Sequence, residues 1–320
     1  MLGVAMIDRF LAAVLLAAAL GFGILVPSPA FPADGSPQTL DCRYAMDTAD
    51  APPADESPAR RVRRFPRDDL FRPVLADPKQ PQFVISRQRV IPDQEGDFVA
   101  GWVVYGETFG IRRYVGDRPC DGVQVNIQGG VFAQFNLSAP SYDLLNADYI
   151  VGLPVTFRRG DVSGRFRVYH QSSHLGDEFL LGSPGVTRVN LSFEDAELLL
   201  SYEWRALRAY GGAARLIHRE PALQNLRWQY GGEFRLPLSK LPRQARMPSF
   251  DYFVAGVDFK QFQQHGYAVD SSIKVGYELE SDLSDRRFRL LFDFYNGFNP
   301  FGQFYDHHIR AIGVEVNFGF

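Results

Sequence analysis

The sequence closes with the stretch IGVEVNFGF, residues Ile312–Phe320, and this stretch decides the fold. Apolar side chains take every second position from Ile312 to Phe320, while glycine, glutamate and asparagine take the positions between them. A period of two is typical of a β-strand with one apolar and one polar face. The stretch therefore predicts a final strand that closes on an aromatic side chain.

The same alternation recurs in four earlier stretches. Their apolar positions are Val123, Val125, Ile127, Val131, Ala133, Phe135 and Leu137; Leu226, Trp228, Tyr230, Phe234 and Leu236; Ile273, Val275, Tyr277 and Leu279; and Phe288, Leu290, Phe292 and Phe294. The first stretch is much longer than the roughly 5–6 residues typical of soluble strands, but it suits a tilted strand that crosses a bilayer. Alternation alone leaves two folds open, because the polar face meets water in a soluble sandwich and the lumen in a membrane barrel.

A resemblance at the C-terminus separates these two folds. Residues Ile312–Phe320 resemble the terminal β-signal of Gram-negative outer-membrane proteins, which the barrel assembly machinery recognises. The resemblance implies an all-β fold, a transmembrane antiparallel β-barrel in the outer membrane, with Phe318 and Phe320 as the assembly signal and that machinery as a partner during biogenesis. The alternative is a last sandwich strand that ends on phenylalanine.

Counting strands backwards from this end predicts a barrel of about 12 strands, an even number as is usual in bacterial barrels. The strands are expected near residues 82–91, 97–111, 122–137, 148–158, 162–174, 188–205, 208–218, 225–238, 249–261, 270–281, 286–296 and 309–320. The tight turns at 159–161 and 282–285 then face the periplasm, and the longer segments at 139–147, 175–187 and 297–308 face outward.

Charged side chains fall on the inner face in this register. They are Arg165, Arg167, Arg227, Glu233, Arg235, Glu278, Arg287 and Glu315. Opposite charges enclosed in a small barrel pair with one another, so we expect a filled lumen rather than an open, porin-like channel.

The beginning of the sequence predicts export. Arg9 closes a short basic region, an apolar run extends from Phe10 to Val26, and Ser28-Pro29-Ala30 supplies small residues for cleavage, so residues 1–30 are interpreted as a Sec signal peptide. The alternative is a membrane anchor, because the run is nearly long enough to span a bilayer. Residues 31–81 lack apolar periodicity and are expected to form an irregular periplasmic segment before a barrel of residues 82–320.

The net charge of the chain restricts the classes of binding partner. The formal net charge is only -3, so there is no electrostatic case for a nucleic-acid partner.

The two cysteines, Cys42 and Cys120, both fall in parts expected to be periplasmic. A disulfide between them, tying the N-terminal segment to the first periplasmic turn, is therefore expected.

One group of side chains could carry chemistry. The lipid face of the strand near residues 162–174 is apolar from Val162 to Val168 and then continues into His170, Ser172 and His174. Residues two apart on a strand project side by side, roughly 6–7 Å from each other. The His170 imidazole can therefore act as a general base towards the Ser172 hydroxyl.

The run His170-Gln171-Ser172-Ser173 resembles the His-Gln-Ser-Asn stretch of the outer-membrane phospholipase A family, and barrel lipid A deacylases of the PagL type also use a His-x-Ser pair. The resemblance implies a lipid acyl-ester hydrolase acting on outer-membrane lipids, with His170 as base and Ser172 as nucleophile. Ser173 replaces the asparagine of that family, and no Asn or Glu stands at an obvious position on the next strand. Asp177 and Glu178, in the following loop, are then the candidates to orient the imidazole.

A wider resemblance covers most of the mature chain. Residues 169–179 and 71–78 are similar to an uncharacterised proteobacterial outer-membrane family of unknown function, and that similarity implies no activity.

Other interpretations of the histidines stay open. His170 and His174 could belong to the interfacial girdle of a non-enzymatic structural or narrow transport barrel. They could also bind a metal ion together with Asp177 and Glu178 if the loop folded over the strand. The sequence indicates no particular cofactor and does not determine whether calcium is needed.

Overall fold

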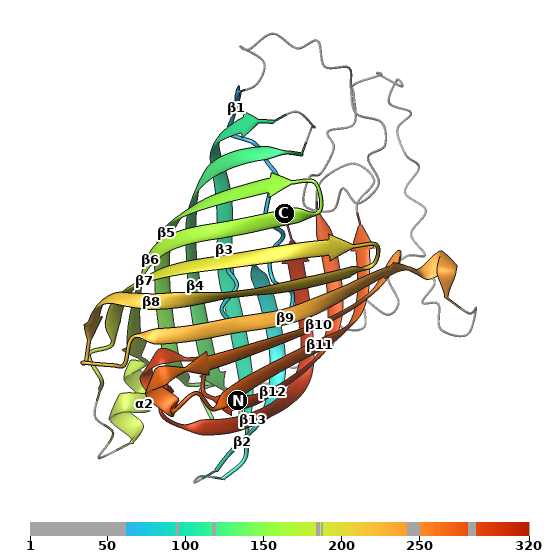
Figure 1. Ribbon diagram of the computed structural model, residues 1–320. Helices are drawn as coiled ribbons and strands as arrows, with labels where there is room; N and C mark the ends of the chain where they lie inside the picture. Colours follow the sequence, from blue (N-terminus) through green and yellow to red (C-terminus); the bar gives the residue numbers. More distant parts are fainter. Residues whose placement is uncertain are drawn as a thin grey trace.

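The chain forms one large antiparallel sheet that closes on itself. The computed structural model describes residues 62–93, 96–116, 120–183, 186, 188–241, 250–280 and 286–319. Strands β2 to β13 pair in sequence order, and β2 pairs with β13, so these twelve strands make a closed barrel. An additional short strand, β1, pairs with β3 beyond the point where β3 meets β2. Figure 1 shows the strands winding around the barrel.

The element bounds are as follows. The strands are β1 (Val62–Arg64), β2 (Phe83–Pro92), β3 (Phe98–Val115), β4 (Gly122–Asn136), β5 (Leu144–Arg159), β6 (Val162–Leu175), β7 (Ser192–Trp204), β8 (Leu207–Glu220), β9 (Leu226–Pro237), β10 (Tyr252–Phe262), β11 (Val269–Glu280), β12 (Arg287–Phe298) and β13 (His308–Gly319). The helices are α2 (Asp177–Gly182), η2 (Leu238–Lys240), η4 (Gln263–His265) and η5 (Gly302–Phe304). None of the described helices has the length and apolar character needed to cross a membrane.

The predicted fold class is confirmed, and all twelve expected strands are present with small shifts. Strand β5 begins at Leu144 rather than near residue 148, and β7 begins at Ser192 rather than near 188. The early start of β5 has a physical reason, because Asn146 and Asp148 point inward and accept hydrogen bonds from the backbone of the β12–β13 connection. Polar residues that resemble a loop in the sequence therefore continue the strand.

The tight turn between β5 and β6 shows how local chemistry sets the register. Arg159 pairs with Val162, which leaves Gly160 and Asp161 as the connection. Gly160 has a positive φ of 59°, a conformation that glycine adopts without steric cost. The turn therefore fixes which residues of β6 face outward.

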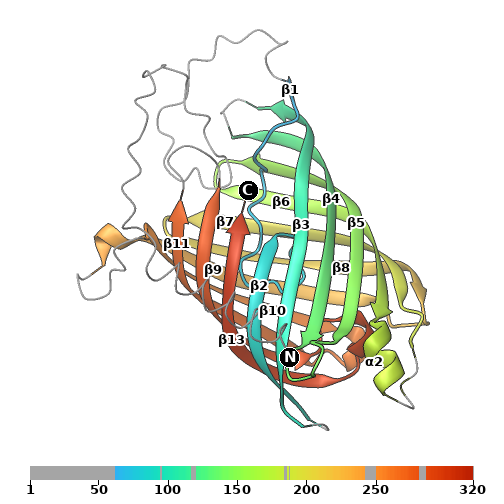
Figure 2. The same ribbon diagram turned by 180° about the vertical axis from the view of Figure 1, so that it is seen from behind.

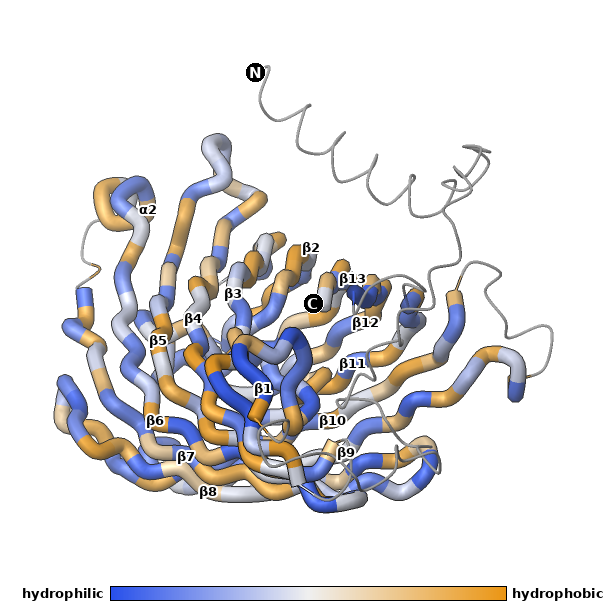
Figure 3. Tube along the Cα trace, turned by 90° about the horizontal axis from the view of Figure 1, so that it is seen from above, coloured by the Kyte–Doolittle hydropathy of each residue, from blue (hydrophilic) through white to orange (hydrophobic). Residues whose placement is uncertain are grey.

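The outer face of the barrel is apolar. Exposed hydrophobic side chains follow the alternate positions of the strands, for example Val162, Phe166 and Val168 on β6. Figure 3 shows hydrophilic and hydrophobic residues alternating along the strands. A monomeric soluble protein rarely exposes so much contiguous apolar surface, whereas a barrel in a bilayer requires it.

The inner face carries buried ion pairs, as expected from the sequence. Glu197 accepts from both Arg165 and Arg167 at 2.8 Å, and Arg227 bonds to it at 3.0 Å. Glu278 accepts from Arg289 at 2.6 Å and from Arg235 at 2.8 Å. These pairs occupy the space that a porin leaves to water.

The segment between β1 and β2, residues 66–82, lies inside the barrel. Its apolar side chains Leu70, Phe71 and Val74 are almost completely buried. Its charged side chains pair with the wall: Arg72 contacts Glu233 at 2.9 Å, and Asp77 accepts a hydrogen bond from Lys260. Figure 2 shows this part of the chain running past β2 and β3 from β1. Residues 66–82 are called the lumen segment below.

Candidate functional site

The outer face of β6 changes character at one end of the barrel. The side chains of Val162, Phe166 and Val168 are exposed apolar groups, and the same face continues into His170, Ser172 and His174. The buried, inward face of the strand carries Arg165, Arg167, Tyr169, Gln171 and Ser173. The candidate base and nucleophile therefore lie on the surface of the barrel that faces lipid, not in the lumen.

Glu194 is the residue that orients His170. The register of β6 and β7 places His170 directly opposite Glu194, and His170 Nδ1 lies 2.8 Å from Glu194 Oε1. When Nδ1 donates its hydrogen to a carboxylate, the Nε2 atom is left with the lone pair that a general base needs. Both side chains are partly exposed, at 40% for His170 and 37% for Glu194, so the pair is accessible from outside the barrel.

A second histidine shares the same carboxylate. His218 Nδ1 lies 2.9 Å from Glu194 Oε2. The pairing of β7 with β8 shifts by one residue here, because Glu194 pairs with His218 while Asp195 pairs with Leu216. Such a bulge re-aims a side chain, and it brings His218 to the outer face beside Glu194.

Ser172 lies two residues beyond His170 on the same face. Its register partners are Tyr149 on β5 and Ser192 on β7. No hydrogen bond between the His170 and Ser172 side chains is present in the described residues, and the strand geometry spaces them by roughly 6–7 Å. Catalytic hydrogen bonds of this kind often tighten only when substrate binds.

His174 stands apart from this group. Its ring makes an edge contact with Tyr149, with ring centroids 5.7 Å apart. The side chain is exposed at the end of the strand, where amphipathic rings commonly meet lipid headgroups.

The expectation that the next strand offers no group to orient the imidazole is wrong. Glu194 occupies that position on β7, whereas Asp177 and Glu178 begin helix α2, where both are exposed. No ion pair joins Asp177 or Glu178 to the histidines in the described part of the chain. A signal for Glu194 was present in the sequence, because Glu194 is the charged member of an otherwise uncharged face of β7. That face consists of Ser192, Glu194, Ala196, Leu198, Leu200 and Tyr202.

The metal-binding interpretation finds no support in this arrangement. Among the described residues, no group of three or more His, Cys, Asp or Glu side chains is placed to hold a metal ion. His170 and His174 are four residues apart on an extended strand, and the loop that carries Asp177 and Glu178 forms a helix instead of folding over them.

The remaining predicted residues are those of the assembly signal and the disulfide. Phe318 pairs with Phe83 of β2 and with Phe288 of β12, where the two rings meet edge to face at 5.2 Å. Phe320 and Cys42 lie outside the described residues. Cys120, just before β4, is buried and disulfide-bonded. The assembly signal and the Cys42–Cys120 pairing stay predictions.

The closed barrel with an apolar exterior defines the class of the protein, an outer-membrane β-barrel. The chain is similar to several solved structures of that class. The outer-membrane phospholipase dimer with bound calcium from Salmonella typhi has a TM-score of 0.50 at 12% identity, over 75% of this chain and 90% of that chain. The Escherichia coli outer membrane phospholipase A has a TM-score of 0.49 at 10% identity, over 75% and 90% of the two chains. The translocator domain of the autotransporter NalP from Neisseria meningitidis has a TM-score of 0.39 at 12% identity, over 75% and 88%.

The particular family follows from the sequence match. The family described as "Protein of unknown function (DUF1207)" matches residues 45–320, and the chain belongs to it. No curated protein matches the sequence.

Proposed function

We propose that this barrel is a lipid acyl-ester hydrolase of the outer membrane, in which Ser172 is the nucleophile, His170 the general base and Glu194 the residue that orients the base. The hydrogen bond of 2.8 Å between His170 and Glu194, on the lipid-facing surface beside Ser172, is the observation that carries the proposal. Base, orienting carboxylate and nucleophile are the three parts that serine hydrolases share on unrelated folds.

The reaction follows from these roles. Ser172 Oγ attacks the ester carbonyl carbon while its proton passes to His170 Nε2, and Glu194 stabilises the imidazolium. The tetrahedral intermediate collapses, the C–O bond of the ester breaks, and the imidazolium returns the proton to the leaving alcohol. Water, activated by the same imidazole, then releases the fatty acid and regenerates Ser172.

The surroundings of Ser172 favour a lipid as substrate. The site lies on the outer barrel surface, and the apolar side chains of Phe166 and Val168 precede it along β6. An acyl chain in the bilayer can lie along this apolar stripe, while the ester group reaches the polar end formed by His170 and Ser172. Phospholipids and acylated lipid A both carry acyl esters between their acyl chains and their polar headgroups.

The proposal is tested on refolded protein in detergent micelles, by following fatty-acid release from phospholipid and from lipid A. Ser172→Ala and His170→Ala are each expected to lower the rate by about a thousandfold or more. The assay is run with calcium and with a chelator, since the Salmonella typhi structure contains calcium. His307→Ala is the matched control, because His307 is an exposed loop histidine.

Heat-modifiable gel migration establishes that each variant is folded. Loss of activity in both variants, with the control unaffected, supports the hydrolase. A folded wild-type protein that releases no fatty acid from either lipid, with or without calcium, would overturn it.

A non-enzymatic barrel is the second candidate, and one observation favours its structural form over a transport pore. The lumen segment and the buried ion pairs fill the interior, including Arg72–Glu233 and Lys260–Asp77. A solute path along the barrel axis would have to displace these contacts.

Biogenesis completes the proposal. We propose that residues 1–30, which lie outside the described residues, are removed as a Sec signal peptide. The barrel assembly machinery then inserts the chain through its C-terminal strand, with Phe318 and Phe320 as the signal.

A further inference from the structure

A cavity lies inside the barrel at the end that carries the longer connections. Its volume is about 140 Å³, and it is bounded by the connections β8–β9, β10–β11 and β12–β13 and by the end of the lumen segment at Pro78 and Lys79. Gln171 lines it from β6, and Gln171 points inward while its neighbours His170 and Ser172 point outward. The cavity is therefore separate from the proposed catalytic site.

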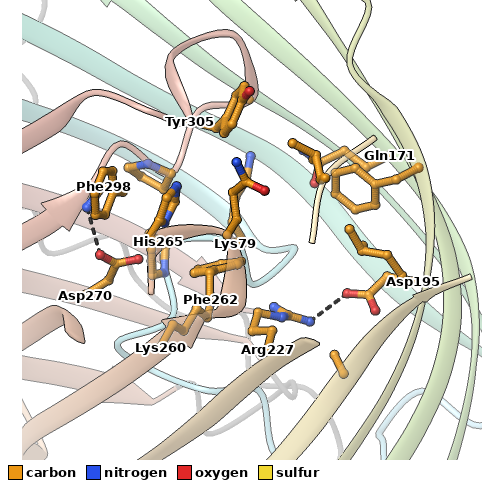
Figure 4. A pocket seen from close by; sticks show the side chains of 18 of the residues that line it. Lys79, Gln171, Asp195, Arg227, Lys260, Phe262, His265, Asp270, Phe298 and Tyr305 are labelled. Atoms are coloured by element: carbon orange, nitrogen blue, oxygen red, sulfur yellow. Dashed lines mark hydrogen bonds and ion pairs between the residues drawn. The ribbon is translucent and has the colours of Figure 1, made fainter. Parts of the chain in front are cut away.

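Aromatic rings form one wall of this cavity. This wall consists of four rings that Figure 4 shows on one side of the cavity: Phe262, His265, Phe298 and Tyr305. The His265 ring stacks on Phe298 with centroids 3.6 Å apart, and it lies 5.7 Å from Phe262 and 6.5 Å from Tyr305. Burial lowers the pKa of the His265 imidazole and so favours its uncharged form.

Asp270 lies close to Phe298 and His265 (Figure 4). Its side chain accepts a hydrogen bond of 2.7 Å from the Phe298 backbone amide, and the residue is only 4% exposed. No ion pair to Asp270 is present among the described residues. A buried carboxylate without an ion pair is costly, and a ligand that brought a positive charge would offset this cost.

The cations of the cavity are, by contrast, already paired. Lys260 donates to Asp77, Lys79 to Asp148, Arg167 to Glu197 at 2.8 Å and Arg227 to Asp195 at 2.8 Å. Asp258 is bonded by Tyr210 and by Gln229, each at 2.9 Å. Among the described charged residues that line the cavity, Asp270 is thus the one that makes no ion pair, and its side chain is a carboxyl group.

We infer that this cavity binds a small organic cation, with its ammonium group at Asp270 and its apolar body against the aromatic wall. Aromatic faces attract ammonium groups through the ring quadrupole, and a buried carboxylate adds direct charge pairing. The volume resembles that of an engineered protein cavity of about 150 Å³ that holds benzene, so the ligand has the size of a phenyl or short alkyl ammonium compound.

Calorimetric titration of the refolded full chain in a non-ionic detergent tests the inference, with three probes of one shape. The probes are 2-phenylethylammonium, its neutral counterpart 2-phenylethanol and the anion 3-phenylpropanoate. The ammonium compound is expected to bind at least about tenfold more tightly than either of the others. Asp270→Asn should remove that preference while leaving the weak binding of the alcohol unchanged.

Asp306→Asn is the matched control, because Asp306 is an exposed carboxylate on the same connection as Tyr305 and does not line the cavity. It is expected to keep the preference for the ammonium compound. Tyr305→Ala removes one ring of the aromatic wall from a connection rather than from a strand. This variant should bind the ammonium compound more weakly than the wild-type protein does.

Equal binding of the amine and the alcohol, or tighter binding of the anion, would overturn the inference, as would the absence of binding by all three probes. Retention of the preference in a folded Asp270→Asn variant would overturn it as well. None of these results bears on ester hydrolysis, which uses the outer face of β6.

Discussion

At the scale of single residues, the proposed chemistry depends on Glu194. A histidine and a serine two positions apart on a strand are common, and they become a working pair only when a third group fixes the imidazole. Glu194 does this from β7, at 2.8 Å from His170, and it also binds His218 at 2.9 Å. The shared carboxylate distinguishes this arrangement from an ordinary girdle histidine that meets headgroups.

Replacing Glu194 by glutamine should therefore lower ester hydrolysis without unfolding the barrel. We expect a loss of about a hundredfold or more in the turnover number and little change in KM, because an amide cannot stabilise the imidazolium that forms in the transition state. Fatty-acid release by Glu194→Gln, compared with wild type across pH, gives the measurement.

The matched control is Glu220→Gln. Glu220 is an exposed carboxylate at the end of β8, and it pairs with Ser192 at the start of β7. A Glu194→Gln variant with full turnover would show that the His170–Glu194 bond only stabilises the surface.

At the scale of elements, the lumen segment acts as a core for the barrel. Glu233 accepts hydrogen bonds from Arg72, from the Leu75 backbone amide and from Arg208, so one carboxylate joins the segment to the wall. Phe71 packs with Val74, Leu199 and Tyr210 in a buried cluster. Apolar packing and ion pairing thus hold the segment in place together.

Breaking the Arg72–Glu233 pair should destabilise the barrel markedly. Arg72→Ala removes the closer of the two guanidinium groups from Glu233 and leaves only Arg208, at 3.3 Å, to balance the buried carboxylate. Loss of one member of a buried ion pair costs up to about 3–5 kcal/mol. The free energy of unfolding of the refolded protein, measured by urea titration with tryptophan fluorescence, checks this value.

Arg89→Ala serves as the comparison, because Arg89 pairs with Asp97 on the surface, where the Arg89 side chain is 66% exposed. Removal of that pair should cost no more than about 1 kcal/mol. Similar losses in both variants would mean that the lumen segment contributes nothing special to stability.

At the scale of the whole molecule, the filled lumen sets what the barrel cannot do. The wild-type protein is expected to show no porin-like conductance in planar bilayers, because the lumen segment and its ion pairs with the wall occupy the interior of the barrel. A variant lacking residues 67–80, checked for folding by heat-modifiable migration, should conduct. Porin-like conductance of the wild-type protein, or a deletion variant that folds and stays closed, would contradict this description of the lumen.

The sequence alone determined the strands and their outer surface, and the resemblance of its C-terminus to a β-signal favoured a barrel over a sandwich. Alternation with a period of two is a local property, since each strand must present one face to lipid and one to the lumen. For the same reason, the outward position of His170 and Ser172 could be predicted from the neighbouring apolar residues Phe166 and Val168 on the same strand.

Only the tertiary structure decided which side chains meet. The Glu194–His170 and Glu194–His218 contacts depend on the register between neighbouring strands and on a bulge in β8. The lumen segment has no period of its own, because it is packed by contacts from all sides rather than by a sheet or helix face. The cavity at Asp270 likewise arises where three connections meet. Contacts between residues far apart in the sequence leave no local pattern, and for that reason the site and the lumen became visible only in the folded chain.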